Sequence, residues 1–237
     1  TTCAHKPSYT LGYNLYKWKV RARVGGVWKS WSETKGFTVT PPGFYSGFNG
    51  SMTGWQPAGD SAWSVSDTDL VSVTDEDDKF SYIYRSAGRY TDVDFSARMR
   101  CSGDLNCEQY LYIRATSTLS GLQEPLEGYS FGIYDGYFMV FKLADPLAEI
   151  LEFGENKAIL EGDWNTLRVV AYGSTLVFYI NGVIVSIEDD NSYSRGFIGL
   201  GYFLQDPTLT TYLVDWARAS VLLKGSASTF AVETGQP

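Results

Sequence analysis

Carboxylates are the side chains of this sequence whose spacing could support catalysis. Histidine-based catalysis has little to draw on, because the chain contains one histidine, His5. One histidine excludes multi-histidine metal sites, and a Ser-His-Asp or Cys-His nucleophile would have to recruit it. Glycoside hydrolysis instead needs two carboxylates that face each other across a cleft. The nearest cluster, Glu149, Glu152 and Glu155, has a spacing of three, which does not place the acids on one face of a strand. We therefore predict that the chain is not an enzyme.

Two acidic runs could supply oxygen ligands to calcium, which prefers carboxylates and carbonyls. They are Asp75-Glu76-Asp77-Asp78 and Glu188-Asp189-Asp190. Neither run has the spacing of a known calcium loop, and an exposed acidic turn is the simpler interpretation. We predict no cofactor and keep calcium as the alternative.

Tyrosines form the best candidate binding surface. Sugars pack their C–H faces on aromatic rings, while polar groups fix their hydroxyls. Alternation along residues 110–115 places Tyr110, Tyr112 and Arg114 on the face opposite the core, and we expect Tyr134 and Tyr179 to point the same way. A solvent-facing or interdomain sheet without any ligand is the alternative. The predicted ligand-binding set is Tyr112, Arg114, Tyr134, Asp135, Tyr137 and Tyr179.

The three cysteines suggest one disulfide. Cys101 and Cys107 flank the polar turn SGDLN between two strand-like runs, so a bridge across a hairpin is predicted. Such a bridge would contribute about 2 kcal/mol and would favour an oxidising compartment. Two free thiols in a loop are the alternative, and Cys3 has no partner nearby in the sequence.

The clearest structural signal is the stretch Gly162–Val185. Two period-two apolar runs flank Tyr172-Gly173-Ser174, and the second run ends at Asn181-Gly182, a strong hairpin signal. This predicts three strands of an antiparallel meander. Further short strands with turn signals follow one another from Phe44 to Val221, and no amphipathic helix is evident. The predicted fold class is therefore all-β, as a sandwich or barrel.

The N-terminal 40 residues form a separate pattern. In LYKWKVRARVGGVWKSWSETKGFTV, apolar residues alternate with Lys and Arg, and Gly25-Gly26 provides a turn. This stretch resembles the last strands of a fibronectin type III module. We predict a partial module over residues 1–40, a Pro-Pro linker over 41–43, a β-domain over 44–222 and a tail over 223–237.

The order of segments in the β-domain resembles the concanavalin A-like, LamG-like jelly rolls of bacterial extracellular proteins and of accessory modules of carbohydrate-active enzymes. The resemblance implies two antiparallel sheets, a concave face and frequent glycan binding. Relatives often hold a structural calcium with opening and closing acids, but here only Asp215 remains. Trp63, Trp164 and Trp216 are predicted to be core residues. The segments that carry the resemblance are Phe48–Trp55, Trp63–Leu70, VDFSARMR, YLYIRA, GYSFGIYDG, GDWNTLRVVAYGSTLVFYING, SRGFIGLGYF and YLVDWARA.

The net charge of -8 and the pI of about 4.7 argue against nucleic acid and anionic membranes as partners. No apolar run reaches the roughly 18 residues that span a bilayer. We expect part of a larger, secreted or cell-surface chain. The predicted function is a non-catalytic extracellular module that binds a polysaccharide or glycan. A structural or adhesive spacer is the alternative, and a glycoside hydrolase is a more distant one.

Overall fold

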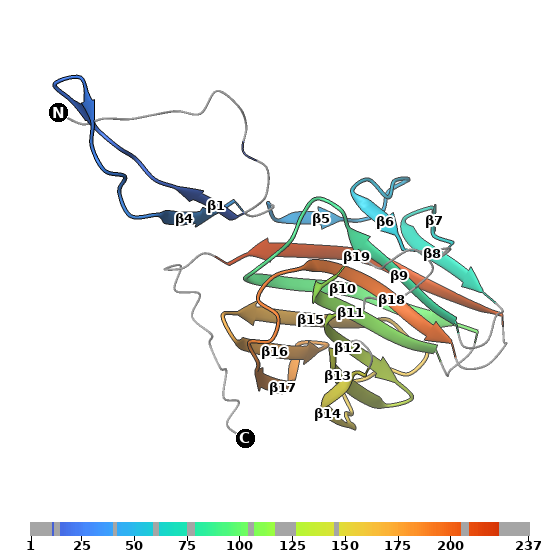
Figure 1. The fold of residues 1–237 in the computed structure, drawn as a ribbon. Coiled ribbons are helices and arrows are strands. Elements are labelled where there is room, and N and C mark those ends of the chain that lie inside the picture. Colours follow the sequence, from blue (N-terminus) through green and yellow to red (C-terminus); the bar gives the residue numbers. More distant parts are fainter. Residues whose placement is uncertain are drawn as a thin grey trace.

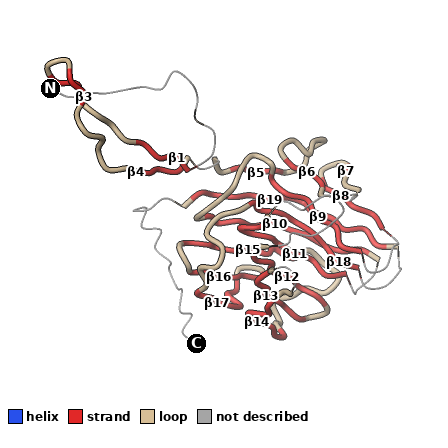
Figure 2. Tube along the Cα trace, viewed as in Figure 1, coloured by secondary structure: helices blue, strands red, loops and turns tan. Residues whose placement is uncertain are grey.

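The described part of the chain is built from strands and turns. The computed structural model describes residue 11 and residues 15–39, 42–58, 62–74, 79–103, 107–116, 127–144, 147–204 and 209–222. Two antiparallel sheets face each other as a sandwich, which confirms the predicted all-β jelly-roll class (Figures 1 and 2). No helix long and apolar enough to cross a membrane occurs in these ranges.

One layer is an eight-stranded sheet with the order β17-β16-β15-β10-β19-β8-β7, to which β5 adds by pairing with β19. Its strands are β5 (Phe44–Ser46), β7 (Ser64–Ser66), β8 (Asp69–Thr74), β10 (Val93–Ser102), β15 (Asn165–Tyr172), β16 (Thr175–Ile180), β17 (Val183–Asp189) and β19 (Thr210–Val221).

The other layer is a seven-stranded sheet with the order β14-β13-β12-β11-β18-β9-β6. Its strands are β6 (Trp55–Pro57), β9 (Lys79–Arg85), β11 (Cys107–Ala115), β12 (Gly128–Tyr134), β13 (Tyr137–Leu143), β14 (Glu149–Glu155) and β18 (Phe197–Leu204).

The main core lies between the two sheets, because alternate residues of each strand point inward. Val93, Phe95 and Ala97 of β10 are buried there, as are Leu111 and Ile113 of β11. Full burial of one such large apolar side chain contributes about 1.5–3 kcal/mol.

The meander predicted for Gly162–Val185 is confirmed. β15, β16 and β17 pair in sequence order, and the turns lie at residues 173–174 and 181–182. Asn181 and Gly182 have φ angles of 49° and 86°, in the left-handed region that the Asn-Gly pair tolerates well.

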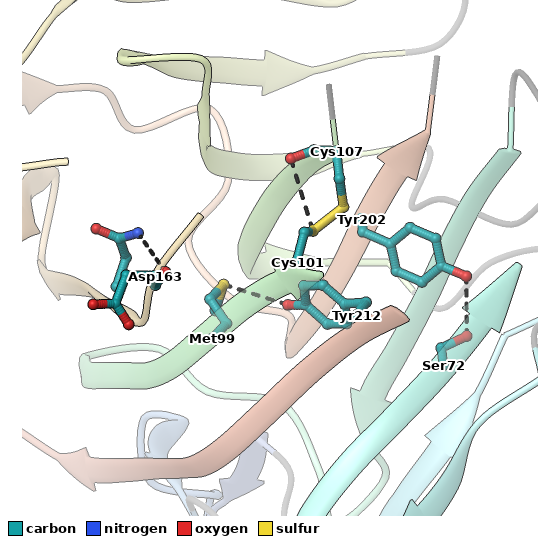
Figure 3. Close-up of a disulfide and its surroundings, with 8 residues drawn as sticks. Ser72, Met99, Cys101, Cys107, Asp163, Tyr202 and Tyr212 are labelled. Carbon is teal, nitrogen blue, oxygen red and sulfur yellow. Dashed lines mark hydrogen bonds between the residues drawn. A yellow bond between two sulfur atoms is a disulfide. The ribbon is translucent and has the colours of Figure 1, made fainter. Parts of the chain in front are cut away.

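Cys101 and Cys107 are joined in a disulfide (Figure 3). The two cysteines do not bridge a hairpin as predicted. Cys101 lies near the end of β10 in the eight-stranded sheet, and Cys107 is the first residue of β11 in the seven-stranded sheet. The bond therefore links the two layers of the sandwich where the chain crosses between them. Beside it, the hydroxyls of Tyr202 and Ser72 form a 3.0 Å hydrogen bond across the core.

The N-terminal strands pair only among themselves in the described part of the chain. β1 (Leu15–Trp18) pairs with β4 (Lys35–Thr38), and β2 (Arg23–Val24) pairs with β3 (Val27–Trp28), so the segment extends away from the sandwich (Figure 1). The turn predicted at Gly25-Gly26 is confirmed by φ angles of 58° and 80°. Arg21 lies over the rings of Trp28 and Trp31 at 4.4 and 4.6 Å.

A polar cluster fastens one edge of the sandwich. Tyr129 of β12 donates a short hydrogen bond to Asp190, and Lys142 of β13 lies 3.4 Å from the same carboxylate. Burial by itself would raise the pKa of Asp190, but the hydrogen bonds from Tyr129 and Ser192 and the charge of Lys142 hold it at about 2.

This depressed pKa predicts an acid-sensitive contribution to stability. Asp190 ionises near pH 3.8 when unfolded and near pH 2 when folded. Its stabilisation is therefore present above about pH 4 and disappears as the pH falls to about 2. Denaturant unfolding across this range should show a steeper loss of stability in the wild type than in Asp190→Asn. Parallel curves would contradict the prediction, and Asp189→Asn, at an exposed neighbour, is the control.

Candidate functional site

The seven-stranded sheet is apolar on both of its faces. Its inner face contributes to the main core, while Tyr82, Tyr110, Tyr112 and Met139 form a second buried cluster on the outer face. The predicted alternation of Tyr110 and Tyr112 away from the core is therefore observed. We call this outer surface the tyrosine face.

Glycines on neighbouring strands make room for these tyrosine rings. A Cβ added to Gly132 would lie 2.4 Å from the ring of Tyr110, and one added to Gly199 would lie 2.1 Å from the ring of Tyr82. No larger residue fits at either position without displacing the ring. The tyrosine rings therefore pack over these glycines, close to the backbone of the neighbouring strands.

A groove of about 320 Å³ lies over the tyrosine face, and it crosses five strands. Its size is at the low end of the range of about 300–1,000 Å³ that is usual for small-molecule pockets. We call it the aromatic groove. Its lining residues are Phe80, Glu108, Tyr110, Tyr112, Ser130, Phe141, Leu143, Ala148 and Phe203.

Strand register sets the two sides of the aromatic groove. On one side Phe203 lies opposite both Phe80 and Glu108, and the two phenyl rings stack with centroids 4.2 Å apart. On the other side Ser130 lies opposite both Tyr112 and Phe141. Apolar rings thus flank a floor that carries a carboxylate and hydroxyl groups.

Glu108 is the only carboxylate among the groove-lining residues that the structure describes. The residue is 8% exposed and accepts a short hydrogen bond from the hydroxyl of Tyr110, which also lies 3.3 Å from the sulfur of Met139. The carboxylate is therefore held in one orientation. It can accept further hydrogen bonds from a ligand that donates them.

Two of the predicted binding residues prove to be buried. Tyr112 lies on the expected face and borders the aromatic groove, but it is only 2% exposed. Arg114 does not continue the alternation, because the register with β18 shifts between Tyr112 and Ala115 and Arg114 has a φ angle of 49°. The prediction that Arg114 lies on the outer face with Tyr110 and Tyr112 is wrong, since a bulge turns its side chain into the interior.

The guanidinium of Arg114 is instead a buried structural group. It donates hydrogen bonds to the carbonyls of Thr91, Tyr193 and Gly173 at 3.0, 3.1 and 2.8 Å. Asp92 lies 3.6 Å away as the counter-ion. Burial lowers the pKa of Arg114 from its ordinary value, and the charge of Asp92 opposes that shift. Three backbone segments, at residues 91–92, 173 and 193, are thereby tied to one side chain.

Tyr134, Asp135 and Tyr137 lie around the turn between β12 and β13. Tyr134 packs against the tyrosine face, and Asp135 begins the turn with a φ angle of 44°. The ring of Tyr137 stacks on Phe153 at 5.2 Å, and its hydroxyl donates to Glu155 at 2.9 Å. Of these three residues only Tyr134 contacts the same cluster as Tyr112.

Tyr179 belongs to the other sheet, so its predicted place beside Tyr134 is wrong. β16 lies in the eight-stranded sheet, where the Arg168 guanidinium covers the ring of Tyr179 at 4.7 Å. Trp164 and Trp216 are likewise half-buried under arginines, and of the three predicted core tryptophans only Trp63 is buried. Period-two patterns identify a face but not the sheet that carries it.

The acidic runs do not converge on a metal site in the described residues. Glu149 pairs with Lys142, Glu155 accepts from Tyr137, and Glu152 accepts from the backbone of Phe153. Asp215, the remaining acid of the closing strand, pairs with Arg98. The run from Asp75 to Asp78 lies outside the described residues.

Sequence reasoning missed most of the residues that line the aromatic groove. The signal that could have found them is glycine at every second position of a strand, as at Gly199 and Gly201 before Phe203. Such glycines mark positions where rings from neighbouring strands, here Tyr82 and Tyr112, pack against the backbone. The missed residues are Phe80, Glu108, Ser130, Phe141, Leu143, Ala148 and Phe203.

Solved structures with carbohydrate-related names share this fold. The chain is similar to the carbohydrate-binding module CBM66 from Bacillus subtilis, with 18% identity, a TM-score of 0.54, and coverage of 69% of this chain and 93% of that one. It is also similar to a β-glucanase from Bacillus licheniformis, with 11% identity, a TM-score of 0.58, and coverage of 78% and 100%. At these identities the likeness establishes the fold alone. No curated protein sequence matches the chain.

A family model matches most of the β-domain. The model describes the 3-keto-alpha-glucoside-1,2-lyase-like domain, and it matches residues 43–204. This range is more than half of the 237 residues. The chain therefore belongs to the 3-keto-alpha-glucoside-1,2-lyase-like domain family.

Proposed function

We propose that the β-domain is a non-catalytic carbohydrate-binding module and that the aromatic groove is its binding site. The observation that carries this proposal is the arrangement of Phe203 and Phe141 on opposite sides of a floor that holds Glu108 and Ser130. Similarity to the carbohydrate-binding module CBM66 supports the same class of ligand.

The chemistry of the groove matches that of a sugar ring. Phenyl rings on two sides can pack against C–H faces, and Glu108 and Ser130 can fix hydroxyl groups between them. The rings are held in place by strand pairing and by the stacking of Phe80 on Phe203. Little conformational freedom is lost when a ligand binds to such a site.

The carboxylates of the groove support a binding role without catalysis. Retaining glycosidases need two carboxyl groups about 5–5.5 Å apart, and inverting enzymes need about 6.5–9.5 Å. In the described lining of the groove Glu108 has no second carboxylate opposite it.

A glycan-array screen of the whole chain tests the proposal directly. We expect retention on polysaccharides or oligosaccharides that have exposed pyranose or furanose faces, unchanged by chelator. A folded protein that binds no glycan would overturn the proposal and would favour the spacer function. Binding that chelator abolishes would instead require a cation in the site.

Lyase chemistry is the second candidate, and the family name together with one observation favours it. Glu108 and Tyr110 form a short hydrogen bond at the groove floor, which is an arrangement suited to proton transfer. Incubation with a 3-keto-glucoside and detection of released sugar separates the two candidates. Turnover that Glu108→Gln abolishes would establish an enzyme and would refute the non-catalytic proposal.

We also propose that the protein works outside the cell or at its surface. The disulfide between Cys101 and Cys107 supports this location, because such bonds persist in oxidising compartments. The fibronectin-like N-terminal pattern remains a prediction, and it fits a multidomain extracellular chain.

A further inference from the structure

A buried amide oxygen without a hydrogen-bond partner lies at one end of the sandwich. Gln109 of β11 points to the inner side of its sheet, is 8% exposed, and its Oε1 atom accepts no hydrogen bond. A buried polar atom that makes no hydrogen bond is unfavourable and calls for a partner that the protein itself does not supply. The side chain lines a cavity of about 40 Å³ next to Cys101 and Cys107.

A larger, acidic bowl lies beside this small cavity. The bowl has a volume of about 320 Å³, and it shares Asp135, Ile159 and Glu161 with the cavity. Glu161 reaches over the β12–β13 turn, since a Cβ added to Gly136 would lie 3.2 Å from its Oε1 atom. We call the cavity and bowl together the end site. The other residues that line the bowl are Gly136, Tyr137, Glu155, Asn156 and Lys157.

The segment that forms one wall of the end site is firmly held. Asn165 accepts from the backbone N–H of Leu160 at 2.9 Å and donates to the Leu160 carbonyl at 2.8 Å. Asn181, from the β16–β17 turn, donates to Asn165 at 2.9 Å and to the carbonyl of Ala158 at 2.7 Å. The backbone N–H of Asn156 donates to the carbonyl of Gly136 at 3.0 Å. The end site is therefore preorganised rather than formed by a loose loop.

We propose that the end site binds a hydroxyl-rich small molecule, either a monosaccharide unit or a polyol, with one hydroxyl group donating to Gln109 Oε1. The carboxylates of Asp135 and Glu161 accept further hydroxyl hydrogens, and Tyr137 forms part of the wall. The aromatic groove shares no lining residue with the end site, so this is a second site and does not depend on the proposed function.

Other ligand chemistries fit the end site less well. Anions are disfavoured because Asp135, Glu155 and Glu161 surround the bowl and oppose its one ammonium group, Lys157. Calcium, the divalent cation considered above, needs six to eight oxygen ligands. In the described part of the chain no three acidic, histidine or cysteine side chains come close enough to hold a metal.

NMR titration of the ¹⁵N-labelled protein with D-glucose, D-galactose, D-fructose and glycerol tests the end site. We expect at least one probe to shift the Gln109 side-chain amide and the backbone amides of Gly136 and Gly162. Glu161→Gln should raise the Kd of that probe about tenfold or more, because hydrogen bonds to charged groups are the stronger ones. Glu152→Gln, an exposed acid outside the site, should leave it unchanged.

Gln109→Leu separates binding from a structural role. Leu is similar in size and leaves no unpaired polar atom, so the melting temperature should stay the same or rise while the Kd increases. A fall in melting temperature with an unchanged Kd would overturn the proposal. So would chemical shift changes with CaCl₂ but with none of the four probes, or no chemical shift changes with any compound. Phe141→Ala should leave binding at the end site intact. A result that refutes binding in the aromatic groove is therefore distinguishable from one that refutes binding at the end site.

Discussion

Arg114→Met is expected to lower the free energy of unfolding by about 3–5 kcal/mol, because removal of one partner leaves the other charge buried and unpaired. The side chain is 2% exposed and faces Asp92 at 3.6 Å. Its loss also leaves the carbonyls of Thr91, Tyr193 and Gly173 without their donor. For a chain of this size the melting temperature should fall by about 6–20 °C.

Local backbone geometry adds to the cost of changing this position. Gly196 packs directly on the backbone of Arg114, since a Cβ there would lie 2.1 Å from the Arg114 carbonyl carbon. Gly196 therefore holds the backbone of the bulge, while other residues hold the side chain. Arg114→Lys should recover little of the stability, because an ammonium cannot match the planar fork of donors that reaches three carbonyls.

Arg218→Met is the matched control for Arg114→Met. Arg218 is exposed and lies over the ring of Trp216 at 5.2 Å. Its guanidinium also donates to the hydroxyl of Ser96 at 3.1 Å. We expect a loss of about 1–2 kcal/mol, from an exposed cation–π contact and one hydrogen bond. Thermal and denaturant unfolding of both variants measures the difference. Equal losses of unfolding free energy in the two variants would contradict the buried structural role of Arg114.

Phe141→Ala is expected to raise the Kd of the glycan that the array identifies by about thirtyfold or more. Truncation of an aromatic anchor in a desolvated site costs about 2 kcal/mol or more. Phe141 lines the aromatic groove on the side opposite Phe203, and it is only partly buried in the free protein. The fold should tolerate its loss better than the loss of a core residue.

Phe153→Ala is the matched control for the groove, because Phe153 is an exposed phenylalanine on the adjacent strand β14 and does not line the groove. Glu108→Gln should separately raise the Kd about tenfold or more, since it keeps the shape but removes the charge that strengthens ligand hydrogen bonds. Isothermal titration with all three variants measures these effects. Equal weakening by Phe141→Ala and Phe153→Ala would place the ligand elsewhere.

Local sequence patterns determined the elements of this protein. The Asn181-Gly182 turn, the three strands around it and the inward alternation of Val93, Phe95 and Ala97 all follow from short-range rules. The alternation of Tyr110 and Tyr112 away from the core followed from the same rules. Such patterns need only the pleat of one strand, and the sequence contains that information.

Tertiary structure alone decided which of these residues share a surface. Tyr179 and Tyr134 have the same local pattern but lie in different sheets, and the bulge before Ala115 turns Arg114 into the interior. The pairing of β11 with β18 placed Glu108 opposite Phe203, which are far apart in the sequence. Strand order and register arise from contacts between distant segments, so period-two patterns could predict the tyrosine face but not the aromatic groove built on it.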